Sequence, residues 1–124
     1  MKTFIVMPGL NVEDTIEKTF IRLPDQLKAN VVFGDNHSTD NSVNVAESLG
    51  ITVLRHDKNH GFGGNLKRLY HYAIEQDADI VVDLHPDYQY EPMVIDIMIA
   101  FIERGFFEVM QGNRIRRREE ALAG

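Results

Sequence analysis

Residues 3–7 read Thr-Phe-Ile-Val-Met and are followed by Pro8-Gly9, and this stretch decides the fold class. A continuous apolar run that stops at a turn signal is typical of a buried β-strand. Similar runs follow at residues 31–34, 51–54 and 80–82, and residues 106–110 make a fifth. Helical patterns separate the runs. This alternation predicts an α/β fold, a mostly parallel sheet with helices on both faces.

The helical segments have recognisable ends. Residues 12–23 stop at Pro24, residues 43–49 stop at Gly50, and a strongly apolar segment starts near Pro92 and runs through Ile102. The segment after residues 61–64 is expected to bury one apolar face, made of Leu66, Leu69, Tyr70, Ala73 and Ile74.

Composition narrows the classes of function. The chain has 124 residues, no cysteine and a formal net charge of −6. We expect one domain, without disulfides, thiolate metal sites or thiol catalysis, in a reducing compartment such as the cytoplasm. No apolar run is long enough to span a membrane. The acidity argues against a nucleic acid as the main partner.

Polar residues collect where the predicted strands end. Leu10-Asn11 follow the first strand, Asp35-Asn36 the second, and His85-Pro86-Asp87 the fourth. In open α/β sheets, ligands bind outside the carboxyl ends of the strands. The sequence therefore predicts a binding pocket at this edge.

Residues 35–40, Asp-Asn-His-Ser-Thr-Asp, permit two interpretations. In the structural one, Ser38 or Thr39 caps the next helix and Asp35 merely ends the strand. In the functional one, the Asp35 carboxylate accepts a hydrogen bond from a ribose hydroxyl or a base N–H.

The glycine-rich residues 61–64 also remain open to two interpretations. A dinucleotide-binding fingerprint should follow the first strand, whereas this segment follows the third, and no Walker-type lysine is present. The glycines either turn the chain or let backbone amides approach a ligand ahead of a helix.

Residues 85–90, His-Pro-Asp-Tyr-Gln-Tyr, give the sharpest local signal. Asp87 and Gln89 could aim two oxygen ligands at one hard cation, Mg²⁺ or Mn²⁺, with phosphates and water completing the shell. The structural alternative is an Asp-initiated turn closed by tyrosine packing. A Ser38–His85–Asp87 triad is rejected, because the sequence contains no nucleophile elbow.

Five segments together resemble glycosyltransferase family 2, especially the branch of dolichyl-phosphate mannosyltransferase and bacterial polyprenyl-phosphate sugar transferases. They are IVMPGLNVEDTI (5–16), DNHSTDNS (35–42), NHGFGGNLKRLY (59–70), DLHPDYQYEP (83–92) and QGNRI (111–115). They stand in the family's order and spacing across nearly the whole chain.

The resemblance implies a Rossmann-like nucleotide-diphospho-sugar domain of the GT-A type, over residues 1–113. It assigns the nucleotide sugar to nine positions: Pro8, Leu10, Asn11, Glu13, Asp35, Asn36, Gly63, Lys67 and Arg114. Asp87 falls on the family's metal-binding aspartate and Gln89 on the glutamine that joins it, with Mg²⁺ or Mn²⁺ as the cofactor. His85 replaces the first aspartate of the family's D-x-D motif, and Asn36 replaces the second aspartate of its V-D-D motif.

The implied activity is metal-dependent, inverting transfer of a sugar from a UDP- or GDP-sugar to an acceptor, with polyprenyl phosphate as one candidate in cell-envelope glycan synthesis. We expect a truncated domain whose catalytic base lies beyond residue 124, so the alternative is a fragment that binds the nucleotide sugar without transfer. Residues 114–124 form a basic tail, either solvated or bound to a lipid phosphate or anionic membrane surface at the cytoplasmic face. A homodimer is a further expectation.

Overall fold

The structure, a computed structural model, describes residues 1–87, 91–106 and 108–110. Its centre is a sheet of four strands: β1 (Thr3–Gly9), β2 (Val31–Asp35), β3 (Thr52–Arg55) and β4 (Ile80–Asp83). The strand order is β3-β2-β1-β4, and all three neighbouring pairs are parallel. All four carboxyl ends therefore meet at one edge, as the sequence predicted.

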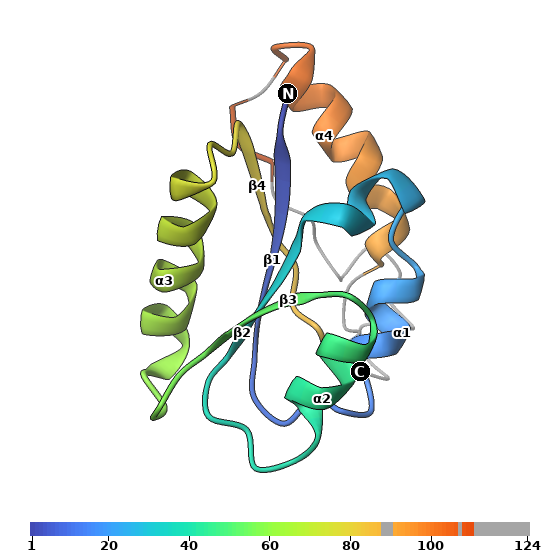
Figure 1. Ribbon diagram of the computed structural model, residues 1–124. Coiled ribbons are helices and arrows are strands. Elements are labelled where there is room, and N and C mark those ends of the chain that lie inside the picture. The colour runs from blue at the N-terminus through green and yellow to red at the C-terminus, as the bar shows by residue number, and fades with distance from the viewer. Residues whose placement is uncertain (88–90, 107, 111–124) are drawn as a thin grey trace, which may run out of the picture.

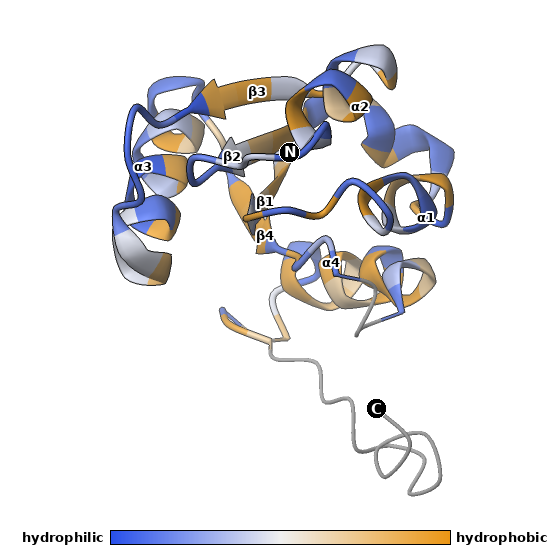
Figure 2. Cartoon of the chain, turned by 90° about the horizontal axis from the view of Figure 1, so that it is seen from below, coloured by the Kyte–Doolittle hydropathy of each residue, from blue (hydrophilic) through white to orange (hydrophobic). Residues whose placement is uncertain are grey.

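Helices cover both faces of this sheet (Figures 1 and 2). On one face lies α3 (Gly61–Glu75); on the other lie α1 (Ile16–Ile21), α2 (Ser42–Ser48) and α4 (Ile95–Glu103). Short 3₁₀ turns, η1 (Asp25–Asn30) and η2 (Pro92–Val94), precede β2 and α4. No helix in the described part of the chain is long and apolar enough to cross a membrane.

Alternation along β1 and β2 builds two apolar layers. Ile5, Met7 and Phe33 point to the side of α1, α2 and α4, and each is at most 1% exposed. Val6 and Val32 point the other way, into a smaller cluster with residues of α3. Because both faces of these strands are buried, they read as continuous apolar runs in the sequence.

The prediction of a fifth strand is wrong for the described residues. Phe106 and residues 108–110 lie in no strand. Gly105, with φ of 78°, ends α4, and the Phe106 amide donates to the carbonyl of Phe101 over 3.1 Å. A glycine in the left-handed conformation commonly ends a helix in this way. The first residue of the apolar run, Phe106, therefore closes α4.

The predicted buried face of α3 was also partly wrong. Leu69 and Ala73 are fully buried, but Tyr70 is 37% and Ile74 66% exposed. Asn65, which is 1% exposed, takes the position one turn before Leu69. Asn65 was not expected to be buried because its side chain is polar, although it lies at helical spacing from Leu69 and Ala73.

Close packing of α3 on β2 depends on Gly34. A Cβ atom there would lie 2.8 Å from Cδ1 and 2.9 Å from Cγ of Leu69, and would also collide with the Asn65 amide. The absent side chain lets the helix approach the strand.

We therefore expect Gly34→Ala to lower the free energy of unfolding by about 1–3 kcal/mol through overpacking. Gly63→Ala is the matched control, because a Cβ at that position meets no atom within 4 Å. This control should be neutral or stabilising by roughly 0.5–1 kcal/mol. Urea unfolding of the whole chain followed by circular dichroism measures both. Equal stabilities for the two variants would contradict the packing argument.

Candidate functional site

The loops after β1 and β2 are joined by hydrogen bonds. Asn11, at φ of 53°, accepts from the amide of Thr39 over 2.9 Å, and its own amide donates to Ser38 Oγ over 2.9 Å. One carboxylate oxygen of Glu13 accepts from the amide of Asn41 over 3.0 Å. The predicted site residues Asn11 and Glu13 thus come together with the loop that follows Asp35.

Asp35 itself is buried, with 3% exposure. Its carboxylate accepts from both the hydroxyl and the backbone amide of Ser38, the latter over 3.2 Å. These bonds close the turn at the end of β2. A carboxylate offers about four acceptor positions, so the two bonds to Ser38 leave acceptor capacity for a ligand.

Neither Ser38 nor Thr39 caps α2, so this part of the structural interpretation of residues 35–40 is wrong. The residue before α2 is Asn41, whose side chain makes no capping bond. Asp40 instead accepts from the amide of Ser42 over 2.9 Å. Burial opposes ionisation of Asp40, but hydrogen bonds from Ser42 and from the Glu13 amide prevail and lower its pKa.

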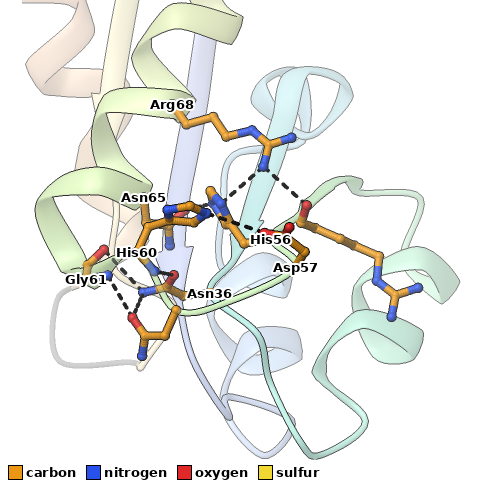
Figure 3. Close-up of polar contacts among 9 residues, drawn as sticks. Asn36, His56, Asp57, His60, Gly61, Asn65 and Arg68 are labelled. Carbon is orange, nitrogen blue, oxygen red and sulfur yellow. Dashed lines mark hydrogen bonds and ion pairs between the residues drawn. The ribbon is translucent and has the colours of Figure 1, made fainter.

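Asn36 holds the start of α3 against the end of β2 (Figure 3). Its Nδ2 donates to Asn59 Oδ1 over 2.7 Å and to the carbonyl of Gly61 over 3.2 Å. Its Oδ1 accepts from the amide of His60 over 2.8 Å. All these partners lie in residues 59–61, so one buried amide group fixes the loop that precedes the glycine-rich turn.

A second polar network lies deeper between β2, β3 and α3 (Figure 3). His56, 5% exposed, bonds to Asn65 Oδ1 through Nε2 over 2.9 Å and to an Arg68 nitrogen through Nδ1 over 3.1 Å. Asn65 Nδ2 donates to the carbonyl of Gly34 over 2.8 Å. Because Arg68 can only donate, Nδ1 accepts and Nε2 carries the proton, which describes a neutral imidazole.

The end of β4 reaches the other strand ends through Pro86. Thr15 Oγ1 donates to the carbonyl of Pro86 over 2.7 Å. A Cβ on Gly9 would lie 3.0 Å from Pro86 Cγ, so glycine permits this close approach. The segment that carries His85 and Asp87 is thereby tied to the end of β1.

His85 also faces α3. Its ring centroid lies 5.2 Å from that of Phe62, and its Nε2 lies 3.9 Å from Asp83 Oδ1. Burial raises the pKa of Asp83, and the His85 imidazole opposes this. Burial, and then the charge of Asp83, raise the pKa of Tyr70.

Asp87 is exposed at this edge. Gln89 and Arg114 lie outside the described residues. Within the described ranges, no group of three or more histidine or acidic side chains could hold a metal ion. A site with one carboxylate ligand fits Mg²⁺ or Mn²⁺ only where phosphate oxygens and water complete the shell.

The remaining predicted residues differ in their surroundings. Pro8 is buried within β1, while Leu10, Gly63 and Lys67 are exposed. Gly61 has φ of 77°, so this glycine turns the chain, which is one of the two interpretations of the segment. At Gly63, open space surrounds the position of a Cβ, so only an approaching ligand would require glycine there.

Sequence reasoning missed the polar residues that build this edge from outside the quoted strand ends, namely Thr15, His56, Asn59, Asn65 and Arg68. Thr15 lies 71 residues before its partner Pro86, and His56 lies 9 residues before its partner Asn65. No local pattern reports such distant pairs. The family resemblance gave an indirect signal for four of them, since Thr15 lies in the matched segment 5–16 and Asn59, Asn65 and Arg68 lie in the matched segment 59–70. His56 lies in none of the matched segments.

A family comparison agrees with this arrangement. The model of the family described as "Glycosyl transferase family 2" matches residues 4–123. The chain belongs to glycosyl transferase family 2.

Two curated relatives extend the comparison. The chain is 26% identical over 117 residues to an uncharacterized protein of Methanocaldococcus jannaschii, covering 94% of this chain and 48% of the relative. It is 25% identical over 134 residues to a UDP-N-acetylglucosamine–dolichyl-phosphate N-acetylglucosaminyltransferase of Methanococcus voltae, covering 94% and 53%. The chain thus spans about half the length of the curated relatives it matches.

Solved structures confirm the fold prediction. Glucosyl-3-phosphoglycerate synthase of Mycobacterium tuberculosis, in complex with phosphoglyceric acid, superposes with a TM-score of 0.68 at 23% identity, covering 84% of this chain and 40% of that one. A cytidylyltransferase of Leptospira borgpetersenii gives 0.66 at 18% identity, covering 85% and 50%. This family 2 chain has the α/β architecture of part of a GT-A domain.

The Asn36 contacts predict a specific sensitivity. In Asn36→Asp, an acceptor-only carboxylate would face Asn59 Oδ1 and the Gly61 carbonyl, so the free energy of unfolding should fall by about 1–3 kcal/mol. Amide exchange should accelerate most at His60 and Gly61. Asn44→Asp makes the same chemical change on the exposed surface of α2 and should change neither quantity. Unaltered exchange at residues 60–61 in Asn36→Asp would contradict the assigned role.

The raised pKa of Asp83 predicts a pH-dependent stability. Folded protein binds this proton more tightly than unfolded chain, so Asp83 lowers the free energy of unfolding as pH rises from 3.8 through the raised value. Asp83→Asn should therefore be more stable than the wild type at pH 7, with the difference vanishing below 3.8. Thermal unfolding across pH measures this, with exposed Asp14→Asn as the control. A variant less stable than wild type at pH 7 would refute the assignment.

Proposed function

We propose that this chain forms the donor-binding part of a metal-dependent, inverting glycosyltransferase, which moves a sugar from a nucleotide-diphospho-sugar to an acceptor. One observation carries the proposal. In a member of family 2, three strand ends and the glycine-rich start of α3 meet at one edge, held together by Asn11, Asn36 and Thr15. Ligands of open α/β sheets bind at such an edge.

The proposal gives each part of this edge a task. Asp35, beside Asn11, would accept a hydrogen bond from the base or ribose. Asp87, with Gln89, would hold Mg²⁺ or Mn²⁺. That cation would supply the positive charge that neutralises a departing diphosphate. By the motif resemblance, Pro8, Leu10, Gly63 and Lys67 would line the nucleotide sugar as part of the same proposal.

The acceptor and the donor base are finer proposals. The Methanococcus voltae relative is named for UDP-N-acetylglucosamine and dolichyl phosphate. We therefore take a UDP-sugar as the first donor to test, before a GDP-sugar, and a polyprenyl phosphate as the first acceptor. The basic run at residues 114–118 would attract such a lipid phosphate at a membrane surface.

A second candidate is a unit that binds the donor without completing transfer. Sugar transfer to a polyprenyl phosphate, assayed with purified protein, separates the two. Binding without turnover would support this second candidate.

The metal assignment yields the prediction that tests the proposal. We expect Asp87→Ala to fold normally and to lose Mn²⁺-dependent affinity for UDP or UDP-sugars in calorimetric titration, because a carboxylate ligand is removed. Exposed Asp14→Ala is the control. Ligand at 100 times its dissociation constant should stabilise the wild type by about 2.7 kcal/mol, and the variant much less. Unchanged metal-dependent affinity in folded Asp87→Ala would rule out this metal site.

A further inference from the structure

The strand β4 is an open edge of the sheet. Among the described residues it pairs with β1 on one side and with no strand on the other. The amide of Ile80 donates to the carbonyl of Lys2 over 3.1 Å, and the amide of Leu84 donates to the carbonyl of Val6 over 3.0 Å. Because bonding direction alternates along a strand, the N–H and C=O groups of Val81 and Asp83 point away from β1. These outward groups can pair with a further strand.

The opposite edge of the sheet is protected, whereas β4 is not. At β3, Arg68 donates from Nη1 to the outward carbonyl of Arg55 over 3.2 Å, so two cationic side chains lie at that edge. Proteins commonly block an edge strand with charged side chains or proline. In β4, residues 80–82 are Ile-Val-Val, and the first charged residue is Asp83 at the end of the strand. The edge at β4 is therefore the one that can accept a strand.

Apolar side chains of α3 flank the open edge. The ring of Phe62 lies 5.2 Å from that of His85, just after β4, and burial and then the charge of Asp83 raise the pKa of Tyr70. This side of α3 thus lies along β4. Phe62, Tyr70 and Ile74 follow one another at helical spacing and are 54%, 37% and 66% exposed. The hydrophobic helix α4 lies at the same end of the sheet on its other face (Figure 2). An added strand would cover apolar surface.

We propose that β4 pairs antiparallel with β4 of a second copy of this chain, which joins the two sheets in a two-fold symmetric dimer. In an antiparallel pair, two residues that lie directly opposite each other exchange both N–H···O=C bonds. Val81 opposite Asp83 of the second copy, with the two-fold axis at Val82, satisfies every outward group of both strands. Such an interface uses the same surface of each copy, as two-fold symmetry requires.

Charge selects this register. In it, each Asp83 faces a valine across the strands. A slip by two residues, which the outward groups also permit, would place Asp83 opposite Asp83 of the second copy in one direction and opposite its Asp79 in the other. Like charges directly opposite each other destabilise a strand pair. Because the two β4 strands run in opposite directions, the carboxyl edges lie at opposite ends of the joined sheet. The dimer therefore goes beyond the proposed function and leaves both candidate donor sites accessible.

Sedimentation equilibrium of the whole chain tests the dimer. The wild type should associate reversibly as its concentration rises from about 1 μM to about 1 mM. Val81→Pro removes an outward N–H at an edge position where proline is tolerated, so association should weaken about tenfold or more. Val53→Pro is the matched control. The amide of His56 donates inward to the carbonyl of Asp35, so alternation places Val53 in the equivalent outward position of β3. This control should associate as the wild type does.

Amide hydrogen exchange of the wild type gives a second readout that needs no variant. The amides of Val81 and Asp83 should exchange rapidly in dilute protein and become protected about tenfold or more as the dimer forms. The amides of Ile80 and Leu84, which are bonded to Lys2 and β1, should stay protected at every concentration.

Three results would overturn the inference. The first is a chain that remains monomeric at about 1 mM. The second is a dimer whose formation leaves the exchange of Val81 and Asp83 unchanged, because its interface would then lie elsewhere. The third is a folded Val81→Pro variant that associates as strongly as the wild type or as Val53→Pro.

Discussion

The contact of α3 with the backbone of β2 at Gly34 positions much of this structure. Asn65 in α3 donates to the Gly34 carbonyl of β2 and accepts from His56, which follows β3. One buried side-chain amide therefore links the helix to a strand and to a loop. A buried donor or acceptor left without a partner costs about 1–3 kcal/mol. The helix can therefore neither slide nor rotate against the sheet without breaking this set of bonds, and the glycine-rich turn at its start stays beside Asn36.

Polar bonds, rather than apolar contacts, also set the positions of the loops at the carboxyl edge. Asn36 fixes residues 59–61, Asn11 fixes residues 39–40, and Thr15 fixes Pro86. No buried side-chain nitrogen or oxygen among the described residues lacks a partner. Such satisfied networks hold a site more narrowly than packing alone, because hydrogen bonds are directional. Asp83 differs from these groups, because partial burial disfavours the charged form of its carboxylate and raises its pKa.

Much of the fold followed from the sequence because its signals are local. Buried strands such as β1 and β2 are continuous apolar runs, and Pro24 and Gly50 end helices by their own backbone restrictions. Phe106 and residues 108–110 show the limit of that reasoning, since an apolar run forms a strand only where it can pair with the edge of a neighbouring strand. Ser38 shows another, because the hydroxyl that could cap α2 instead bonds to Asp35 three residues back.

The candidate site was predictable in place but not in detail. Strand ends and family motifs located Asn11, Asp35, Asn36 and Asp87 at one edge, and the structure describes all four there. The partners that orient them, such as Asn59 and Thr15, depend on chain segments 23 and 71 residues away. Asn65 and His56 read as ordinary polar residues until the fold buries them. Their roles are tertiary, so no pattern in the sequence could show them.

Mapping a nucleotide on the folded chain by NMR tests the central claim most directly. Amide shifts of ¹⁵N-labelled protein would be followed during titration with UDP and GDP in the presence of Mg²⁺. The account predicts that one nucleotide perturbs residues 10–13, 35–40, 60–64 and 84–87, while residues 24–30 and 77–79 at the opposite end of the sheet stay unchanged. Perturbations centred on that opposite end, or none at saturating nucleotide, would contradict a donor site at the carboxyl edge.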